Sequence, residues 1–275
     1  MTDVRRIELI LVDAHVHVYP VFNFAALLSS AYDNFARHAR VRQHAEVPWQ
    51  GVVMLSETSA CDWFARSYAA GEMQLENGWR VVASESESES LWAVGPAQQK
   101  LCIVAGRQVN TREGIEVLTL GTRTHVPDGM TLEETLREAQ AADAVVVLPW
   151  GVGKWLGSRG ALVRKALETH ERQVFAGDNS GRPWIWPRPA IFESSVKRGV
   201  PVLPGTDPLP LAGEEKRVGS FGFVMEGSLP NDRPATYLRD RLRGTALQTL
   251  RPFGRSESVG AFFYNQIKLR LAKAA

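Results

Sequence analysis

Short runs of aliphatic residues alternate along this chain with longer segments of helical periodicity. Strands that are buried on both faces of a parallel sheet read as continuous apolar runs, and crossover helices lie between them. Strands are predicted at residues 7–12, 51–55, 101–105, 114–120, 144–148, 173–176 and 201–203. Helices are predicted at residues 23–40, 59–70, 131–142, 159–170, 189–198, 234–243, 246–251 and 259–272. This order predicts an α/β protein, built as a (β/α) TIM-like barrel or as a doubly wound sheet.

The size of the chain fits one large domain. It has 275 residues, of which 44% are hydrophobic and 23% charged, and a chain of this length can bury about 75% of its unfolded surface. No repeat and no linker rich in Pro, Gly or Ser divides it. We therefore expect a single domain over residues 1–275, with the barrel at about 7–225 and C-terminal helices at about 232–275 packed on it.

Charge and hydropathy narrow the expected partners and location. Thirty-two Lys and Arg against 30 Asp and Glu leave a net charge of +2, which predicts no nucleic-acid partner because nonspecific binding to a polyanion needs a dense basic face. No run approaches the ~18 apolar residues of a membrane span. Cys61 and Cys102 form no paired motif and are expected to be reduced. With no cleavable leader in the first residues, we expect a cytoplasmic protein that binds no membrane.

The strongest chemical motif is Asp13-Ala-His15-Val-His17, directly after the first predicted strand. Residues i and i+2 of an extended chain point the same way about 6.6 Å apart along the strand, so both imidazoles can bind one cation. Asp207, which follows a late predicted strand, is the best third ligand, although Gly205-Thr-Asp-Pro208 is also a good turn sequence. Glu57 is a weaker candidate ligand, with a helix cap as the alternative. One divalent ion, namely zinc, manganese or magnesium, is the expected cofactor.

Polar and aromatic residues follow several other predicted strands, where α/β proteins assemble their sites. Lys154 and Arg182 are predicted to neutralise charge on an anionic substrate, and Arg107 to help bind it. Asp178 is a candidate general base, with a solvated or capping carboxylate as the alternative. Trp150 and Trp184 are candidates for a stacking wall around the substrate, although large aromatic residues more often pack in cores.

One low-complexity stretch, Ser84-Glu-Ser-Glu-Ser-Glu-Ser90, alternates serine with glutamate. Strict alternation places the three carboxylates on one face of an extended chain, where they repel one another. An exposed edge strand or loop whose charge blocks edge pairing is therefore preferred to a cation site.

Three segments together resemble the PHP (polymerase and histidinol phosphatase) superfamily. They are His15-Val-His17, Gly106-Arg-Gln-Val-Asn-Thr111 leading into residues 113–121, and Gly205-Thr-Asp207. The resemblance covers residues 7–225 and implies a distorted seven-stranded (β/α) barrel, phosphoesterase activity, and a metal held by His15, His17 and Asp207. Four further metal-binding positions of the family are occupied here by Glu57, Gln108, Leu148 and Leu209, so we expect one ion.

The predicted function is metal-dependent hydrolysis, as a phosphoesterase acting on a small phosphorylated or anionic substrate. A first alternative is a PHP-like barrel that binds a ligand or partner without hydrolysis. A second is C–N or C–O bond hydrolysis of the amidohydrolase type, because that superfamily also begins with His-x-His. In that case Lys154 is the only candidate for the bridging lysine.

Overall fold

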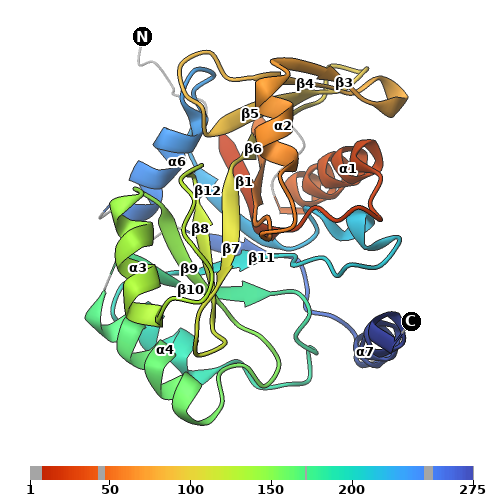
Figure 1. Cartoon of the computed structure of the whole chain (residues 1–275). Coiled ribbons are helices and arrows are strands. Elements are labelled where there is room, and N and C mark those ends of the chain that lie inside the picture. Colours follow the sequence, from red (N-terminus) through yellow and green to blue (C-terminus); the bar gives the residue numbers. More distant parts are fainter. Residues whose placement is uncertain (1–7, 43–46, 171, 245–249, 275) are drawn as a thin grey trace.

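The computed structural model describes residues 8–42, 47–170, 172–244 and 250–274. Its strands form two mixed sheets (Figure 1). The larger sheet has the order β13-β12-β1-β2-β6-β5-β4-β3, with β13 (Arg251–Phe253), β12 (Gly222–Glu226), β1 (Leu9–Val16), β2 (Trp49–Leu55), β6 (Lys100–Val104), β5 (Ser90–Val94), β4 (Arg80–Ala83) and β3 (Glu72–Gln74). The smaller sheet has the order β11-β10-β9-β8-β7, with β11 (Val202–Gly205), β10 (Val174–Asn179), β9 (Val145–Pro149), β8 (Glu116–Leu120) and β7 (Gly106–Asn110).

The predicted TIM-like or distorted seven-stranded (β/α) barrel is wrong, because within the described ranges no ladder of paired strands closes the sheets into a barrel. The reason lies in β1, which pairs in parallel with β2 on one side and, over Leu9–Val12, antiparallel with β12 on the other. β12 thus takes the edge on which β11 would have to pair along the first half of β1. The sheets meet at β1 and β11, where the Asp207 amide donates to the His15 carbonyl over 2.8 Å. They also meet at an isolated bridge between Glu57 and Arg107.

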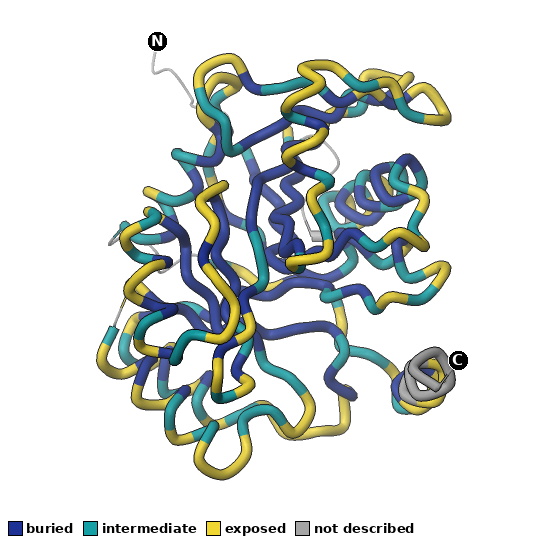
Figure 2. The backbone as a smooth tube through the Cα atoms, in the orientation of Figure 1, coloured by how far each residue is buried: buried dark blue, intermediate teal, exposed yellow. Residues whose placement is uncertain are grey.

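The strands at the centre of the molecule are buried on both faces, as Figure 2 shows for the dark blue segments. In β1, Ile10 and Val12 belong to a hydrophobic cluster shared with the smaller sheet, whereas Leu9 and Leu11 belong to a second cluster under a helix. A strand with two apolar faces has no polar alternation, which explains the continuous apolar run in the sequence.

Helices cover the outer faces of both sheets (Figure 1). On the larger sheet lies α1 (Phe24–Arg42), whose Phe35 reaches Gly51 of β2; a Cβ there would lie 2.7 Å from the Phe35 ring. The remaining helices are α2 (Trp63–Ala69), α3 (Leu132–Ala141), α4 (Gly157–Thr169), α5 (Ala190–Lys197), α6 (Pro234–Arg243) and α7 (Val259–Ala274). None of the helices in the described ranges combines the length and apolar character that a membrane crossing requires.

The C-terminal region contains strands as well as the expected helices. In place of a purely helical pattern after residue 219, β12 and β13 complete the edge of the larger sheet. Residues 246–249 of one predicted helix lie outside the described residues, and Arg251 begins β13. The last helix, α7, contacts the body through Phe262, whose ring lies 5.3 Å from that of Trp186.

Candidate metal centre

His15, His17 and Asp207 come together where β1 and β11 meet. His15 lies near the end of β1, His17 directly follows that strand, and Asp207 lies two residues after β11. The Nε2 atoms of the two histidines are 3.0 Å apart, and each lies 3.5 Å from Oδ1 of Asp207. Both histidines are buried. These three side chains form a cluster that could hold a metal ion.

The backbone around the cluster has two features that bring β11 close to β1. A Cβ on Gly205 would overlap the His15 backbone nitrogen and lie 2.5 Å from the His15 Cβ, so only glycine permits this approach. Asp207 itself has a φ of 49°, in the left-handed region that non-glycine residues rarely adopt. Such strain persists only where surrounding contacts hold it.

Asp13 supplies some of those contacts from inside β1. Its carboxylate accepts hydrogen bonds from the Thr206 amide at 2.8 Å, the Thr206 hydroxyl at 2.6 Å and the Gly219 amide at 2.8 Å. Asp13 is fully buried, and burial raises its pKa to about 6 despite these hydrogen bonds. It therefore fixes the turn that carries Asp207 against β1.

Two amide side chains orient the ligand groups. Nδ2 of Asn179 donates to Oδ2 of Asp207 at 2.8 Å and to the Trp150 carbonyl at 2.7 Å, which leaves Oδ1 of Asp207 facing the histidines. Oδ1 of Asn179 is buried without a hydrogen-bond partner. Gln108 makes a side-chain hydrogen bond with His15. Partners of this kind fix the orientation of metal ligands in proteins.

The electrostatics leave the ligand groups in the forms that bind metals. Burial, with smaller contributions from His17 and Lys154, lowers the pKa of His15 to about 4 against the opposing charge of Asp207. Burial alone would raise the pKa of Asp207, but His15, His17 and Lys154 together hold it well below its usual range. Near neutral pH the site therefore offers a neutral imidazole at His15 and an ionised carboxylate.

The spacing of the three ligand atoms fits a transition-metal ion. Two atoms that each lie about 2.0–2.1 Å from a tetrahedral ion are about 3.3–3.4 Å apart, close to the observed 3.0 and 3.5 Å. Nδ1 of His17 and Oδ1 of Asn179 are both buried without a hydrogen-bond partner. Two imidazoles and one carboxylate form a ligand set that can hold a divalent transition-metal ion.

Glu57 and Arg107 lie outside this cluster. Oε1 of Glu57 accepts from the Phe64 amide at 3.0 Å and from the Cys61 thiol at 3.3 Å, so the carboxylate holds the start of α2. Arg107, predicted in a loop, lies in β7 and donates to the carbonyls of Thr58 and Cys61. Both side chains brace the segment between β2 and α2.

Lys154 lies near the cluster and is paired. Its Nζ forms an ion pair with Glu116 of β8, and its charge acts on both His15 and Asp207. The lysine is still 41% exposed at its side chain, so it can reach an anion at the rim of the site. Because its Nζ is paired with Glu116, the structure does not favour Lys154 as the metal-bridging lysine of the amidohydrolase alternative.

Arg182 and Asp178 are placed on the opposite face of β10 from the cluster. Asp178 is paired with Pro204 of β11, whereas Asn179 is paired with Gly205, which contacts His15. Because neighbouring strand residues point to opposite faces, Asp178 points away from Asp207. Nη2 of Arg182 lies 3.4 Å from Oδ2 of Asp178, and both side chains are buried.

The two tryptophans predicted to form a stacking wall are separated. Trp150 lies against Trp186, with ring centroids 6.4 Å apart, and lines a surface cavity of about 760 Å³ together with Trp155 and Trp186. Trp184 is 68% exposed. Trp150 touches the metal cluster only through its backbone carbonyl, which accepts from Asn179.

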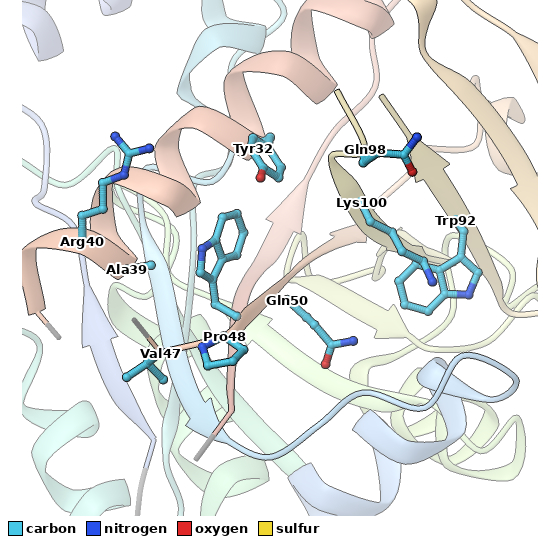
Figure 3. Close-up of a pocket in the computed structure, with 10 residues that line it drawn as sticks. Tyr32, Ala39, Arg40, Val47, Pro48, Gln50, Trp92, Gln98 and Lys100 are labelled. Carbon is cyan, nitrogen blue, oxygen red and sulfur yellow. The ribbon is translucent and has the colours of Figure 1, made fainter. Parts of the chain in front are cut away.

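Another cavity, of about 500 Å³, lies at the far end of the larger sheet (Figure 3). It is lined by aromatic and cationic side chains that include Tyr32, Trp49 and Lys100. Trp49 starts β2 and pairs with Leu9 at the start of β1, whereas His15 lies at the end of β1. This cavity is therefore separate from the metal cluster.

No family model matches this chain, and no curated protein matches it. Among solved structures, the chain is similar to PsfC from Pseudomonas syringae PB-5123, with a TM-score of 0.49, 13% identity, and coverage of 97% of this chain and 99% of PsfC. It is also similar to Endonuclease Q in complex with a 27-mer duplex that carries an abasic lesion, with a TM-score of 0.48, 10% identity, and coverage of 86% and 57%. A third is PfuEndoQ, a lesion-specific endonuclease from Pyrococcus furiosus, with a TM-score of 0.47, 10% identity, and coverage of 86% and 56%.

The chain thus spans little more than half the length of the two endonucleases. At these identities and TM-scores the likeness defines no family, and the PHP resemblance of the sequence stays a prediction. One expectation does need correction: the exclusion of nucleic acid as a partner does not stand, and one of the solved structures above is an endonuclease in complex with a DNA duplex. The physical reason is that a net charge of +2 is a sum over the whole chain and does not describe any local surface.

Several residues of the centre were missed at the level of sequence. Asn179 lies three residues after the predicted strand at 173–176, among several polar residues. Nothing in this local sequence indicates that it contacts Asp207. Asp13 belongs to the same motif as the histidines, two residues before His15. Its hydrogen bonds to Thr206 and Gly219 could not be predicted from that motif. Gln108 was considered only as a substitute ligand, whereas the structure gives it a hydrogen bond to His15.

Proposed function

We propose that this protein is a metal-dependent hydrolase with one ion held by His15, His17 and Asp207, and that its substrates are phosphate esters. The observation that carries the proposal is the convergence of two imidazole nitrogens and one carboxylate oxygen within 3.0 to 3.5 Å of one another. The sequence resemblance of these three residues to phosphoesterase ligands supports the reaction class.

When bound, a divalent ion lowers the pKa of water and supplies positive charge to the phosphoryl group. The chain prepares the site for it. Asn179 holds one oxygen of Asp207 so that the other faces the histidines. Burial keeps His15 neutral, and neutral imidazole is the ligand form. Three protein ligands leave a fourth position open for water or substrate, as in catalytic sites and unlike closed structural ones.

Lys154 is the residue that we propose to contact the anionic substrate. Its charge already acts on the cluster, and its partner Glu116 holds it at the rim of the site. An incoming phosphate would compete with Glu116 for the ammonium group, because both are anions of similar hydrogen-bonding geometry. Arg182, on the other face of β10, is not part of this role.

The test combines metal content with hydrolysis. The purified protein, supplied with zinc or manganese and then dialysed, is analysed for metal and assayed with a chromogenic phosphate monoester, a chromogenic phosphate diester and a DNA duplex that carries an abasic site. We expect about one ion per chain and hydrolysis of at least one of these esters. His15→Ala/His17→Ala should lose both the ion and the activity, whereas His125→Ala, at an exposed histidine, should keep both.

The outcomes separate the competing functions. A protein that holds the ion but cleaves none of the three esters would contradict hydrolysis of phosphate esters and favour binding without catalysis. A protein that holds no ion after metal addition would contradict the metal centre itself. Activity that survives the double histidine change would place the chemistry elsewhere in the chain.

A further inference from the structure

A cavity of about 710 Å³ opens on the face of β10 and β11 that points away from the metal cluster. Val202 and Pro204 of β11 line it, as do residues at the end of α5 and near β13. Its volume lies within the range of pockets that take small molecules. Nothing in the proposed hydrolase site accounts for it.

The charge of the lining is predominantly positive. Three cationic side chains, Arg182, Arg188 and Lys197, line the cavity together with one carboxylate, Asp178. Burial raises the pKa of Asp178, and Arg182 opposes this rise. The rest of the wall is largely apolar, with Val200, Phe221 and several prolines. The cavity therefore offers a cationic corner beside an apolar wall.

Two buried polar groups at this corner lack partners. Arg182 is only 8% exposed, and its Nε has no hydrogen-bond partner; the same is true of Oδ1 of Asp178. The guanidinium donates to the Trp186 carbonyl at 3.1 Å and makes only a long contact of 3.4 Å with Asp178. A buried donor without an acceptor is costly, and more so in a charged group. An oxyanion in the cavity would bring an acceptor to the Arg182 guanidinium, whereas Oδ1 of Asp178 is itself an acceptor and needs a donor.

We propose that this cavity is a second binding site, distinct from the metal centre, for a small molecule that carries a phosphate or carboxylate group on an apolar body. The oxyanion contacts the guanidinium of Arg182, and the exposed Arg188 and Lys197 add positive charge. The apolar body lies against Val200 and Phe221. Arginine suits this role because its planar fork matches the geometry of phosphate and carboxylate oxygens.

The site is tested by calorimetry with phenyl phosphate and benzoate as probes, on the full chain. Arg182→Gln keeps a polar side chain but removes the guanidinium and its charge, and it should weaken binding about tenfold or more, the loss typical of one charge-assisted contact. Arg188→Gln, at an exposed position of the same cavity, should weaken it by a smaller factor. Arg66→Gln, whose partner is Asp62 on α2, serves as the control and should bind as the wild type does.

Phosphate can also bind a metal ion, so the metal centre is removed in a parallel arm. His15→Ala/His17→Ala should keep the affinity for both probes, whatever the outcome for the hydrolase function. If that double change abolishes binding while Arg182→Gln and Arg188→Gln leave it unchanged, the anion binds at the metal centre and the second site does not exist. Absence of binding at millimolar concentrations of both probes would also overturn the proposal. Thermal melts of Arg182→Gln show whether a loss of probe binding reflects unfolding of the variant. If it does, the binding measured with Arg188→Gln decides whether the second site exists.

Discussion

Asn179 is the residue on which the orientation of Asp207 depends. Its Nδ2 donates to Oδ2 of Asp207 at 2.8 Å. Asp207 itself has a left-handed backbone, with a φ of 49°. The side-chain amide therefore acts as a positioning group for the ligand, and not as a ligand itself.

We predict that Asn179→Ala lowers the affinity for zinc by about 10–100-fold, the usual effect of removing a partner of a metal ligand. The chain should still fold, because the change removes two side-chain hydrogen bonds and leaves the three ligands in place. Competition with a chromogenic chelator measures the affinity. Asn77→Ala, in the connection between β3 and β4, is the control, and equal affinities in the two variants would argue against the positioning role.

Asp178 provides a test at acidic pH. Burial raises its pKa above 3.8, against the opposing charges of Arg182 and Arg188, so the folded chain holds a proton more tightly than the unfolded chain. The free energy of unfolding contributed by this group is therefore largest below about pH 4 and falls as the pH rises through the folded-state pKa. Urea unfolding between pH 4 and 7 should show this fall, and Asp178→Asn should flatten it. An identical pH dependence in both proteins would contradict the assignment.

At the scale of the element, the acidic serine–glutamate run has a specific contact. The segment is a loop between β4 and β5, in agreement with one of the two predicted forms. Glu87 accepts hydrogen bonds from the amides of Ala235 and Thr236, at 2.6 and 3.0 Å, at the start of α6. A carboxylate at a helix N-terminus satisfies unpaired amides and interacts favourably with the helix dipole. A residue far away in the sequence thus caps α6.

Glu87→Ala should lower the free energy of unfolding by about 1 kcal/mol, as the loss of a helix cap typically does. Glu85→Ala removes the same charge from an exposed position of the same loop and should change the stability little. Urea unfolding of both variants measures the difference. Equal stabilities would mean that the capping hydrogen bonds add nothing to the folded state.

The elements that were predicted correctly have strong local signals. The capping box of Thr131 and Glu134 is confirmed at the start of α3, and the apolar runs correspond to β1, β2, β6, β8, β9, β10 and β11. The missed strands β3, β4 and β5 have only three to five residues each and pair antiparallel, although β5 does contain the apolar run 91–94. For β7, polar residues such as Arg107 and Gln108 resembled a loop.

The barrel prediction failed at the scale of the whole molecule because strand order is not a local property. The run that became β12 has the composition of a short strand, but nothing near it in sequence states that it pairs with β1. The ligand set could be predicted because His15 and His17 lie two residues apart at the end of β1, where extended-chain geometry relates them directly. Asn179 was not, since its contact with Asp207 depends on how β10 and β11 are placed.

A bound ion would join the two sheets, because two ligands follow β1 of the larger sheet and the third follows β11 of the smaller one. We therefore predict that zinc stabilises the folded chain by about 2.7 kcal/mol when its free concentration is 100 times the dissociation constant. Differential scanning calorimetry with and without zinc measures the shift in melting temperature. His15→Ala/His17→Ala should show no shift, and a shift of equal size in that variant would place the stabilising ion at another site.

The pairing of β1 with β12 also constrains how the chain can be made. Leu9 pairs with Glu226 and Val12 with Phe223, so one edge of β1, which is buried along its whole length, stays open until residues 222–226 have left the ribosome. An open strand edge is a template for pairing with other chains, and domains fold as they emerge during synthesis. Nascent chains that stop before residue 222 should therefore aggregate or require chaperones, even though they already contain every ligand of the proposed metal centre.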